Sequence, residues 1–344
     1  MTSATATADF EQLPIALTPG EPAGIGGEIT LKAWHRRTDS GPVFFAIDDP
    51  ARLERLGEST GLAVPLVTID GPEQAAAVFP TALPVLAHSL ATNPVPGKPD
   101  PANGPAVIAA IETAVALVDA GRASAVVTNP IHKAYLYQAG FGFPGHTEFL
   151  AHLAEANTLP VMMLVSPLLR VVPVTVHVSL SQAIANLNAD IIVQTAQITA
   201  AALRRDFAIA RPRLAIAGLN PHAGEGGAMG IEEADIIAPA VERVRQAGIE
   251  ARGPLPPDTL FHAAARKGYD VVLCMYHDQA LIPIKTLDFD GAVNVTLGLP
   301  FVRTSPDHGT ALDIAGTGKA NEASLVAALR MAADMAQRRA EAAG

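Results

Sequence analysis

Residues 271–277 read VVLCMYH, an apolar run that ends in a histidine. The same arrangement recurs at residues 171–177 (VVPVTVH) and, in a longer form, at residues 214–222 (LAIAGLNPH). Short apolar runs rich in β-branched residues are typical of strands buried on both faces of a parallel sheet. Open α/β sheets bind ligands beyond the carboxyl ends of their strands, so the histidine that ends each run is predicted to face a shared site.

Those three histidines are His177, His222 and His277, and they are candidate ligands of one metal ion. A site with three imidazole ligands leaves a coordination position open for a substrate. Zinc suits such a set and cobalt also fits, whereas magnesium would be unusual with nitrogen ligands. A lone histidine at any of these places would more often be structural, so it is the repeated placement that favours a common site.

The rest of the chain alternates short apolar runs with longer helical patterns, which predicts an α/β fold with a mostly parallel sheet. Strands are expected at residues 14–17, 43–47, 125–128, 161–165, 171–176, 214–217, 271–275 and 293–296. Helices are expected at residues 105–120, 184–204, 232–247 and 323–340. Residues 93–101, NPVPGKPDP, contain too much proline for either element and are expected to form an extended connection.

Composition excludes several classes of protein. The 344 residues suggest about two domains, and 49% hydrophobic residues are enough for a large core. The net charge of -10 argues against a nucleic-acid partner, and no apolar run approaches the ~20 residues that cross a bilayer. The single cysteine, Cys274, rules out an intrachain disulfide and favours a cytoplasmic protein. Residues 1–12 lack the features of a signal peptide.

Two glycine-containing segments follow or precede expected elements. Residues 18–26, TPGEPAGIG, do not fit the G-x-G-x-x-G spacing of dinucleotide-binding loops, so they form either a tight turn or a loop at the floor of a cleft. Residues 145–148, GHTE, stand at an expected helix start, where backbone N–H groups favour phosphate and carboxylate. His146 and Thr147 therefore offer side-chain hydrogen bonds to a substrate, with a capping or surface residue as the alternative for His146.

Polar residues after His277 are candidates for binding an anion. Arginine forks onto phosphate or carboxylate and lysine supplies a compact charge, which Arg303 and Lys285 would do together with Asn294 if this region borders the metal cleft. Otherwise they are solvated surface residues. Asp278 either orients the ring of His277 or is a plain surface carboxylate.

Five segments are distinctive in combination: TPGEPAGIG (18–26), GHTE (145–148), GLNPHAGE (218–225), YHDQ (276–279) and NVTLGLPFVRTS (294–305). Together they closely resemble the 4-hydroxythreonine-4-phosphate dehydrogenase family of pyridoxal 5'-phosphate biosynthesis. The resemblance extends in order from about Pro14 to Ala336. Asn129 stands where the family often has a small residue, and the tail before Pro14 is extra.

The resemblance implies roles for specific residues. It implies that His177, His222 and His277 bind a divalent metal at a site shared across a homodimer interface. The substrate contacts that it implies are His146, Thr147, Lys285, Asn294 and Arg303. Residues 308–321 also resemble the adenosine-binding loop of isocitrate and isopropylmalate dehydrogenases, which implies that His308, Asp313 and Asn321 hold NAD or NADP.

The fold implied by the resemblance has two α/β/α lobes with mostly parallel sheets, similar to those dehydrogenases, and an active site in the interlobe cleft. The first lobe is expected to comprise residues 13–137 and 290–344, with the cofactor loop. The second is expected to comprise residues 138–289, with the metal ligands and the dimer contacts.

The reaction implied is NAD(P)- and metal-dependent oxidation of 4-phosphooxy-L-threonine at its 3-hydroxyl, with decarboxylation to 3-amino-2-oxopropyl phosphate. The general base stays open among Lys133, Asp258 and His146. One alternative is a related dehydrogenase of D-threonate or D-erythronate 4-phosphate. More distant alternatives are a metal-dependent aldolase or hydrolase without a nicotinamide, and a non-catalytic metal-binding protein.

Overall fold

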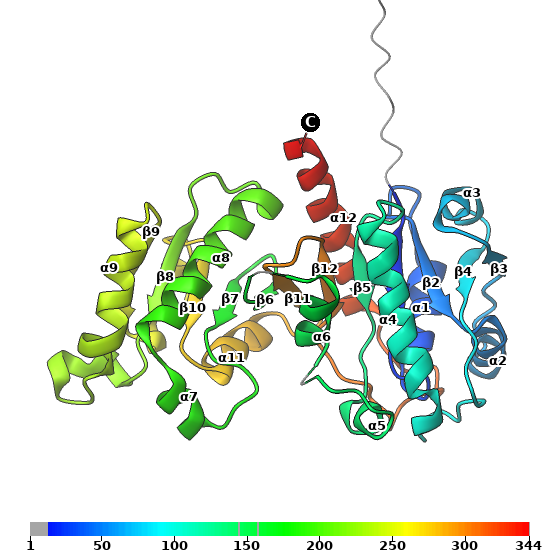
Figure 1. The fold of residues 1–344 in the computed structure, drawn as a ribbon, viewed down its shortest axis with the longest axis horizontal. Coiled ribbons are helices and arrows are strands. Elements are labelled where there is room, and N and C mark those ends of the chain that lie inside the picture. The colour runs from blue at the N-terminus through cyan, green and yellow to red at the C-terminus, as the bar shows by residue number, and fades with distance from the viewer. Residues whose placement is uncertain (1–12, 144, 157, 344) are drawn as a thin grey trace, which may run out of the picture.

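The computed structural model describes residues 13–143, 145–156 and 158–343. The tail of residues 1–12, for which no signal peptide is predicted, lies outside them. Figure 1 shows two lobes side by side, with the C-terminal helix between them. Across the described residues, one 12-stranded sheet runs through both lobes.

The order of strands in this sheet groups them by lobe. From one edge to the other they are β3 (Leu66–Ile69), β4 (Leu83–Ala87), β2 (Phe44–Asp48), β1 (Ile15–Thr18), β5 (Val126–Thr128), β12 (Arg303–Pro306), β11 (Val293–Leu297), β6 (Val161–Val165), β7 (Arg170–Pro173), β10 (Val271–Cys274), β8 (Arg213–Ala217) and β9 (Glu250–Leu255). Neighbours are antiparallel at β12–β11, β11–β6 and β6–β7, near the centre of the sheet. The other pairs are parallel, so the expected fold class is confirmed.

Helices cover both faces of the sheet. They are α1 (Gly26–His35), α2 (Pro50–Thr60), α3 (Ala75–Val78), α4 (Gly104–Asp119), α5 (Lys133–Gln138), α6 (His146–Leu153), α7 (Leu180–Asn186), α8 (Ala189–Phe207), α9 (Ala238–Gln246), α10 (Ala263–Arg266), α11 (His277–Leu287) and α12 (Ala323–Ala343). Short turns of other helical types are η1 (Pro72–Gln74), η2 (Pro101–Asn103), η3 (Pro221–Gly227), η4 (Glu233–Ile237) and η5 (Pro257–Thr259).

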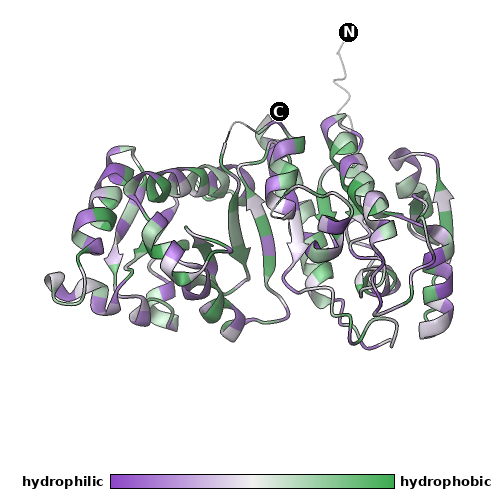
Figure 2. Cartoon of the chain, turned by 60° about the horizontal axis from the view of Figure 1, so that its bottom comes forward, coloured by the Kyte–Doolittle hydropathy of each residue, from purple (hydrophilic) through white to green (hydrophobic). Residues whose placement is uncertain are grey.

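The hydrophobic core is continuous between the lobes on one face of the sheet. There α1, α2, α12, α8 and α9 contribute to a single cluster of buried side chains with the strands beneath them. On the other face, α4 and α6 cover the first lobe and α11 covers the second, each over a separate cluster. Figure 2 shows green, hydrophobic segments on several strands of the sheet, interrupted by paler and purple segments.

Two of the expected helices differ from those observed. The pattern over residues 184–204 predicts one helix, but the chain breaks at Leu187 and Asn188 into α7 and α8. Ser179 begins α7 with a capping box to Gln182, and the side chain of Asn188 caps α8. The break has a local cause, because an asparagine side chain that accepts a backbone N–H starts a new helix. Expected helix 232–247 begins instead with the π-helical turn η4 and continues as α9.

One helical stretch, Pro101–Asp119, is long and apolar enough to span a membrane by length and composition. In this fold it includes α4, which packs against β1 and β5. Its residues Val107, Ala110, Ile111 and Ala114 are buried in the core of the first lobe. These contacts are those of a core helix in a globular domain, which passes the same test of composition.

Candidate functional site

A cavity of about 390 Å³ opens at the carboxyl ends of the central strands. Its walls come from segments that follow β5, β7 and β12, from the first turns of α5, α6 and α11, and from β11. The cavity brings together seven residues that the sequence had singled out: His146, Thr147, His177, His277, Lys285, Asn294 and Arg303.

Two of the candidate metal ligands face each other in this cavity. The ring centroids of His177 and His277 lie 5.8 Å apart. His277 Nδ1 lies 2.7 Å from Asp278 Oδ1, an arrangement that fixes the ring and leaves Nε2 available as a ligand atom. His177 has a φ of +52°, a left-handed conformation that costs energy in a residue with a Cβ.

The pKa of His177 lies below its ordinary value of 6.5, chiefly because burial disfavours the imidazolium and further because Lys133 and His277 are nearby. Neutral imidazole is the form that binds a metal ion. The donor set of the cavity therefore fits a divalent metal, with two facing imidazoles, one of them held neutral by burial and the other oriented by a carboxylate.

The third candidate ligand lies elsewhere in the same chain. His222 is exposed on η3, the turn that follows β8, and it does not line the cavity. Glu233 holds the start of this turn by accepting hydrogen bonds from the backbone N–H groups of Leu219 and Asn220. No group of three or more His, Cys, Asp or Glu side chains is placed to hold a metal ion within the parts of the chain that the structure describes. One subunit alone thus brings together a pair of the expected ligands.

Arg303 is the buried cation of the site. Its guanidinium donates to Thr296 Oγ1 at 2.9 Å and to Thr128 Oγ1 at 2.7 Å, while its Nε has no hydrogen-bond partner among the described residues. Burial lowers its pKa from 12.5 to about 10, with Glu148 acting in the opposite direction. No carboxylate lies within ion-pair distance of it in the described ranges. A buried, unpaired cation is costly and indicates a site for an anionic ligand.

His146 and Lys133 lie beside this cation. The pKa of His146 lies well below 6.5, because the ring is desolvated and because Arg303 and Lys133 repel a second positive charge. Its Nε2 is buried without a partner in the described part of the chain, so a ligand in the cavity can reach an unused nitrogen. A Cβ on Gly145 would lie 3.3 Å from Lys133 Nζ and 3.4 Å from Glu148 Oε2, so glycine allows both side chains to approach this point.

Three residues of the site, Thr128, Thr296 and Asp307, are not predicted from the sequence. Lys285 Nζ pairs with Asp307 Oδ2 at 3.1 Å, and burial raises the pKa of Asp307 despite this partner. Thr128 and Thr296 accept the hydrogen bonds of the Arg303 guanidinium. The available signals were the place of Thr128 at the end of an apolar run and that of Asp307 directly before His308.

The expected cofactor loop begins at the cavity and extends out of it. His308 lines the cavity, and its Nε2 is buried without a partner among the described residues. Asp313 and Asn321 do not line the cavity and are exposed, and Asn321 Oδ1 accepts a hydrogen bond from the N–H of Ala323 at the start of α12. The loop thus runs from the cavity, at His308, to exposed positions at Asp313 and Asn321.

The structure also separates the three candidates for the general base. Lys133 and His146 line the cavity, whereas Asp258 lies in η5, which contacts η3, and is absent from the cavity lining. A second hollow, of about 870 Å³, lies at the opposite ends of β1, β5 and β12, where its walls are mainly apolar. It contains none of the polar residues discussed above.

Comparison with known proteins identifies the family of the chain. Residues 42–332 match the family described as pyridoxal phosphate biosynthetic protein PdxA. The 4-hydroxythreonine-4-phosphate dehydrogenase of Bradyrhizobium diazoefficiens is 57% identical over 335 residues, which cover 94% of this chain and 97% of the relative. The crystal structure of the enzyme of that name from Klebsiella pneumoniae superposes with a TM-score of 0.85 at 39% identity, covering 94% of this chain and 100% of that one. A terephthalate 1,2-cis-dihydrodiol dehydrogenase from Burkholderia xenovorans is more distant, with a TM-score of 0.62 at 29% identity, covering 94% of this chain and 98% of that one.

Proposed function

The chain belongs to the pyridoxal phosphate biosynthetic protein PdxA family and is an oxidoreductase of that family, and on this premise we propose its full reaction. The substrate is 4-phosphooxy-L-threonine, which is oxidised at its 3-hydroxyl with NAD or NADP as hydride acceptor. The ketone formed lies β to the carboxylate, so CO₂ is lost and 3-amino-2-oxopropyl phosphate remains. The enzyme thereby acts in pyridoxal phosphate biosynthesis.

The proposal rests on the environment of Arg303. This side chain is buried, its Nε is unpaired in the described residues, and no carboxylate there balances its charge. A doubly anionic substrate, with a phosphate at one end and a carboxylate at the other, supplies that charge. Lys285, Asn294, His146 and Thr147 line the same cavity, so they can bind the remaining polar groups of the substrate and fix its orientation.

We propose that His177 and His277 of one subunit and His222 of a second copy bind one divalent metal, with zinc as the preferred ion and cobalt or magnesium as alternatives. This arrangement is supported by the exposure of His222 and by its absence from the cavity of its own chain. When bound, the metal acts as a Lewis acid that lowers the pKa of the substrate hydroxyl. A homodimer with two shared sites follows from the symmetry of such an exchange.

The residues of this chain bind and orient the substrate and the cofactor. Arg303 and Lys285 hold the anionic groups, while neutral His146 can donate or accept one hydrogen bond at Nε2 without adding charge. Lys133 or His146 is placed to receive the hydroxyl proton, and we assign neither. Asp313 and Asn321 are proposed to bind the adenosine part of the cofactor, and His308 to mark the point where the cofactor enters the cavity. We place the enzyme in the cytoplasm, which suits its buried free thiol Cys274.

A panel of substrates tests the proposal. Metal-stripped protein is reconstituted with zinc, cobalt or magnesium and assayed for NAD and NADP reduction with 4-phosphooxy-L-threonine, D-threonate 4-phosphate and D-erythronate 4-phosphate. We expect the first substrate to give the highest kcat/KM, and only after metal is returned. A preference for one of the sugar-acid phosphates would identify the related dehydrogenase instead. Metal-dependent turnover without any nicotinamide reduction would indicate the aldolase or hydrolase.

A further inference from the structure

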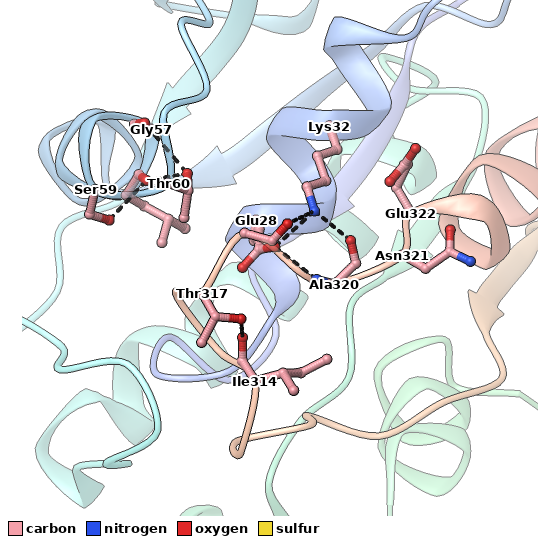
Figure 3. Close-up of polar contacts among 12 residues, drawn as sticks. Glu28, Lys32, Gly57, Ser59, Thr60, Ile314, Thr317, Ala320, Asn321 and Glu322 are labelled. Atoms are coloured by element: carbon pink, nitrogen blue, oxygen red, sulfur yellow. Dashed lines mark hydrogen bonds and ion pairs between the residues drawn. The ribbon is translucent and has the colours of Figure 1, made fainter.

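One face of α1 is joined to the end of the loop formed by residues 307–321. Glu28, Lys32 and Arg36 are spaced by four residues, so they lie along one side of the helix. Figure 3 shows Glu28 and Lys32 projecting from α1 toward the chain at Ala320. The function proposed above uses the loop but gives these residues no role.

Glu28 and Lys32 hold the loop by its backbone. Glu28 Oε1 accepts a hydrogen bond from the N–H of Ala320 at 2.9 Å. Lys32 Nζ donates to the carbonyl oxygens of Gly318 and Ala320, at 2.9 and 2.6 Å, and to Glu28 Oε1 at 2.9 Å. Both polar groups of Ala320 are thus bound by one ion pair, so the path of residues 318–320 depends on that pair rather than on contacts within the loop.

Burial distinguishes this ion pair from its neighbour on the same face. The side chain of Glu28 is fully buried and that of Lys32 is 11% exposed. Glu28 Oε2 is also buried and has no hydrogen-bond partner among the described residues, so Lys32 is the group that balances its charge. In the neighbouring pair of Arg36 with Glu322, the arginine is 70% exposed and the carboxylate 5% exposed, and neither side chain bonds the backbone of residues 318–320 among the described residues.

The start of the loop rests on the segment just before α1. The N–H of Ile25 donates to the carbonyl of Thr310 at 3.1 Å, and a Cβ on Gly24 would lie 2.9 Å from that oxygen. Residues 18–28 therefore support the loop at both ends. This gives a physical use to a glycine run whose spacing does not match a dinucleotide fingerprint.

We infer that Glu28 and Lys32 are positioning residues for the nicotinamide cofactor. By fixing the backbone of residues 318–320, they hold Asn321 and the segment that carries Asp313 in the arrangement that binds the adenosine end. A loop that is already ordered loses less conformational entropy when its ligand binds, so affinity for the cofactor depends on this pair. The inference rests on the proposed function, in which the loop is the cofactor site.

The test replaces the pair without leaving a charge buried. In the double variant Glu28→Gln/Lys32→Met, the introduced glutamine amide can still accept the Ala320 N–H, whereas both lysine bonds to the loop are lost. We expect the Kd for NAD, measured by calorimetry, to rise about tenfold or more. The KM for NAD should rise in parallel, while bound metal and the KM for the phosphorylated substrate stay within about twofold, because neither ligand touches the loop end. Arg36→Met/Glu322→Gln is the matched control, because it replaces the neighbouring ion pair without leaving a charge buried, and its Kd for NAD should stay within about twofold of wild type.

The possible results distinguish failure of this inference from failure of the proposed function. If wild type binds neither NAD nor NADP, the proposed function fails and this inference fails with it. If wild type binds NAD and the folded Glu28→Gln/Lys32→Met variant binds it equally well, or if Arg36→Met/Glu322→Gln weakens binding as much, only the role of the pair of Glu28 and Lys32 is refuted. If the Glu28→Gln/Lys32→Met variant does not fold, hydrogen exchange on wild type decides. The amide of Ala320 should exchange slowly even without NAD, because Glu28 accepts it, and rapid exchange in the ligand-free protein would refute the inference.

Discussion

The rings of His177 and His277 lie 5.8 Å apart at the ends of adjacent parallel strands, and Asp278 holds one of them. Two imidazoles at this separation can share one ion, but a stable site needs a third ligand. His222 of the same chain does not line the cavity. We therefore expect His222 of a second subunit to complete the site, and mixed dimers can test this.

Mixed dimers should recover activity that neither parent has. His222→Ala and His277→Ala are each expected to be inactive and to retain little metal. When the two variants are co-expressed, activity should return to about a quarter of wild type, because about half the dimers are mixed and each mixed dimer has one intact site. Activity and metal content of the separated heterodimer provide the measurement. As a control, His177→Ala mixed with His277→Ala should stay inactive, and recovery there would contradict the shared site.

The acid limb of the pH profile should lie below the ordinary histidine value. The pKa values of His177 and His146 are both lowered from 6.5, chiefly by burial, so both rings remain neutral as pH falls to that value. Protonation competes with ligand binding only at lower pH. We expect kcat/KM to stay level down to about pH 6.5 and to decline below it. A midpoint above pH 7, or a plateau that extends to pH 4, would contradict the assignment.

Arg303→Lys tests whether the site needs the planar guanidinium or only a positive charge. Lysine keeps the positive charge but cannot bond Thr128, Thr296 and the substrate at once, because it lacks the planar fork. We expect kcat/KM for the phosphorylated substrate to fall by about tenfold or more, mostly through KM. The Kd for NAD should change little. Unchanged steady-state constants would remove Arg303 from the site.

Arg303→Met should impair function without loss of stability. The guanidinium is buried without a carboxylate in the described residues, so the ligand-free protein holds a desolvated charge. Replacing it with an apolar side chain should leave the free energy of unfolding equal or higher, while substrate affinity falls by about a hundredfold or more. Denaturant titration and substrate binding measure the two effects. A large loss of stability would show that Arg303 has a structural role instead.

Asp206 joins the lobes and should be a major source of stability. Its fully buried carboxylate accepts two hydrogen bonds each from Arg205 of α8 and Arg339 of α12. Asp206→Asn should lower the free energy of unfolding by about 3 kcal/mol near neutral pH. The exposed pair of Glu73 and Arg122 is the control, and Glu73→Gln should have little measurable effect on stability, because solvent screens that pair.

The same interaction predicts a dependence on pH. Burial alone would raise the pKa of Asp206, but the hydrogen bonds from both arginines outweigh it and hold the pKa below 3.8. The stabilisation is therefore present above the unfolded value and is lost as pH falls through the lower, folded value. The difference in unfolding free energy between wild type and Asp206→Asn should shrink in that acidic range. A difference that is constant down to pH 2 would contradict the ion-pair account.

The sequence by itself determined the elements whose signal is local. The apolar runs at 214–217 and 271–275 appear as β8 and β10, and the glycines Gly121 and Gly248 adopt left-handed conformations where helices end. The combination of glycine, histidine and threonine motifs determined the family, because each motif is a short segment whose chemistry depends on residue order. The two edge strands, β3 and β9, are not predicted from the sequence; most of their residues are exposed or half-buried, so they lack the continuous apolar run of a strand covered on both faces.

Tertiary structure alone decided how these pieces combine. It joined the lobes through one sheet, buried Arg303 between two threonines, and kept His222 apart from the other two histidines. It also used α1 to support the loop at residues 318–320, which no spacing predicts. The physical reason is that hydrophobic periodicity is set by residues a few positions apart, whereas desolvation and strand order depend on contacts between segments that are distant in the chain.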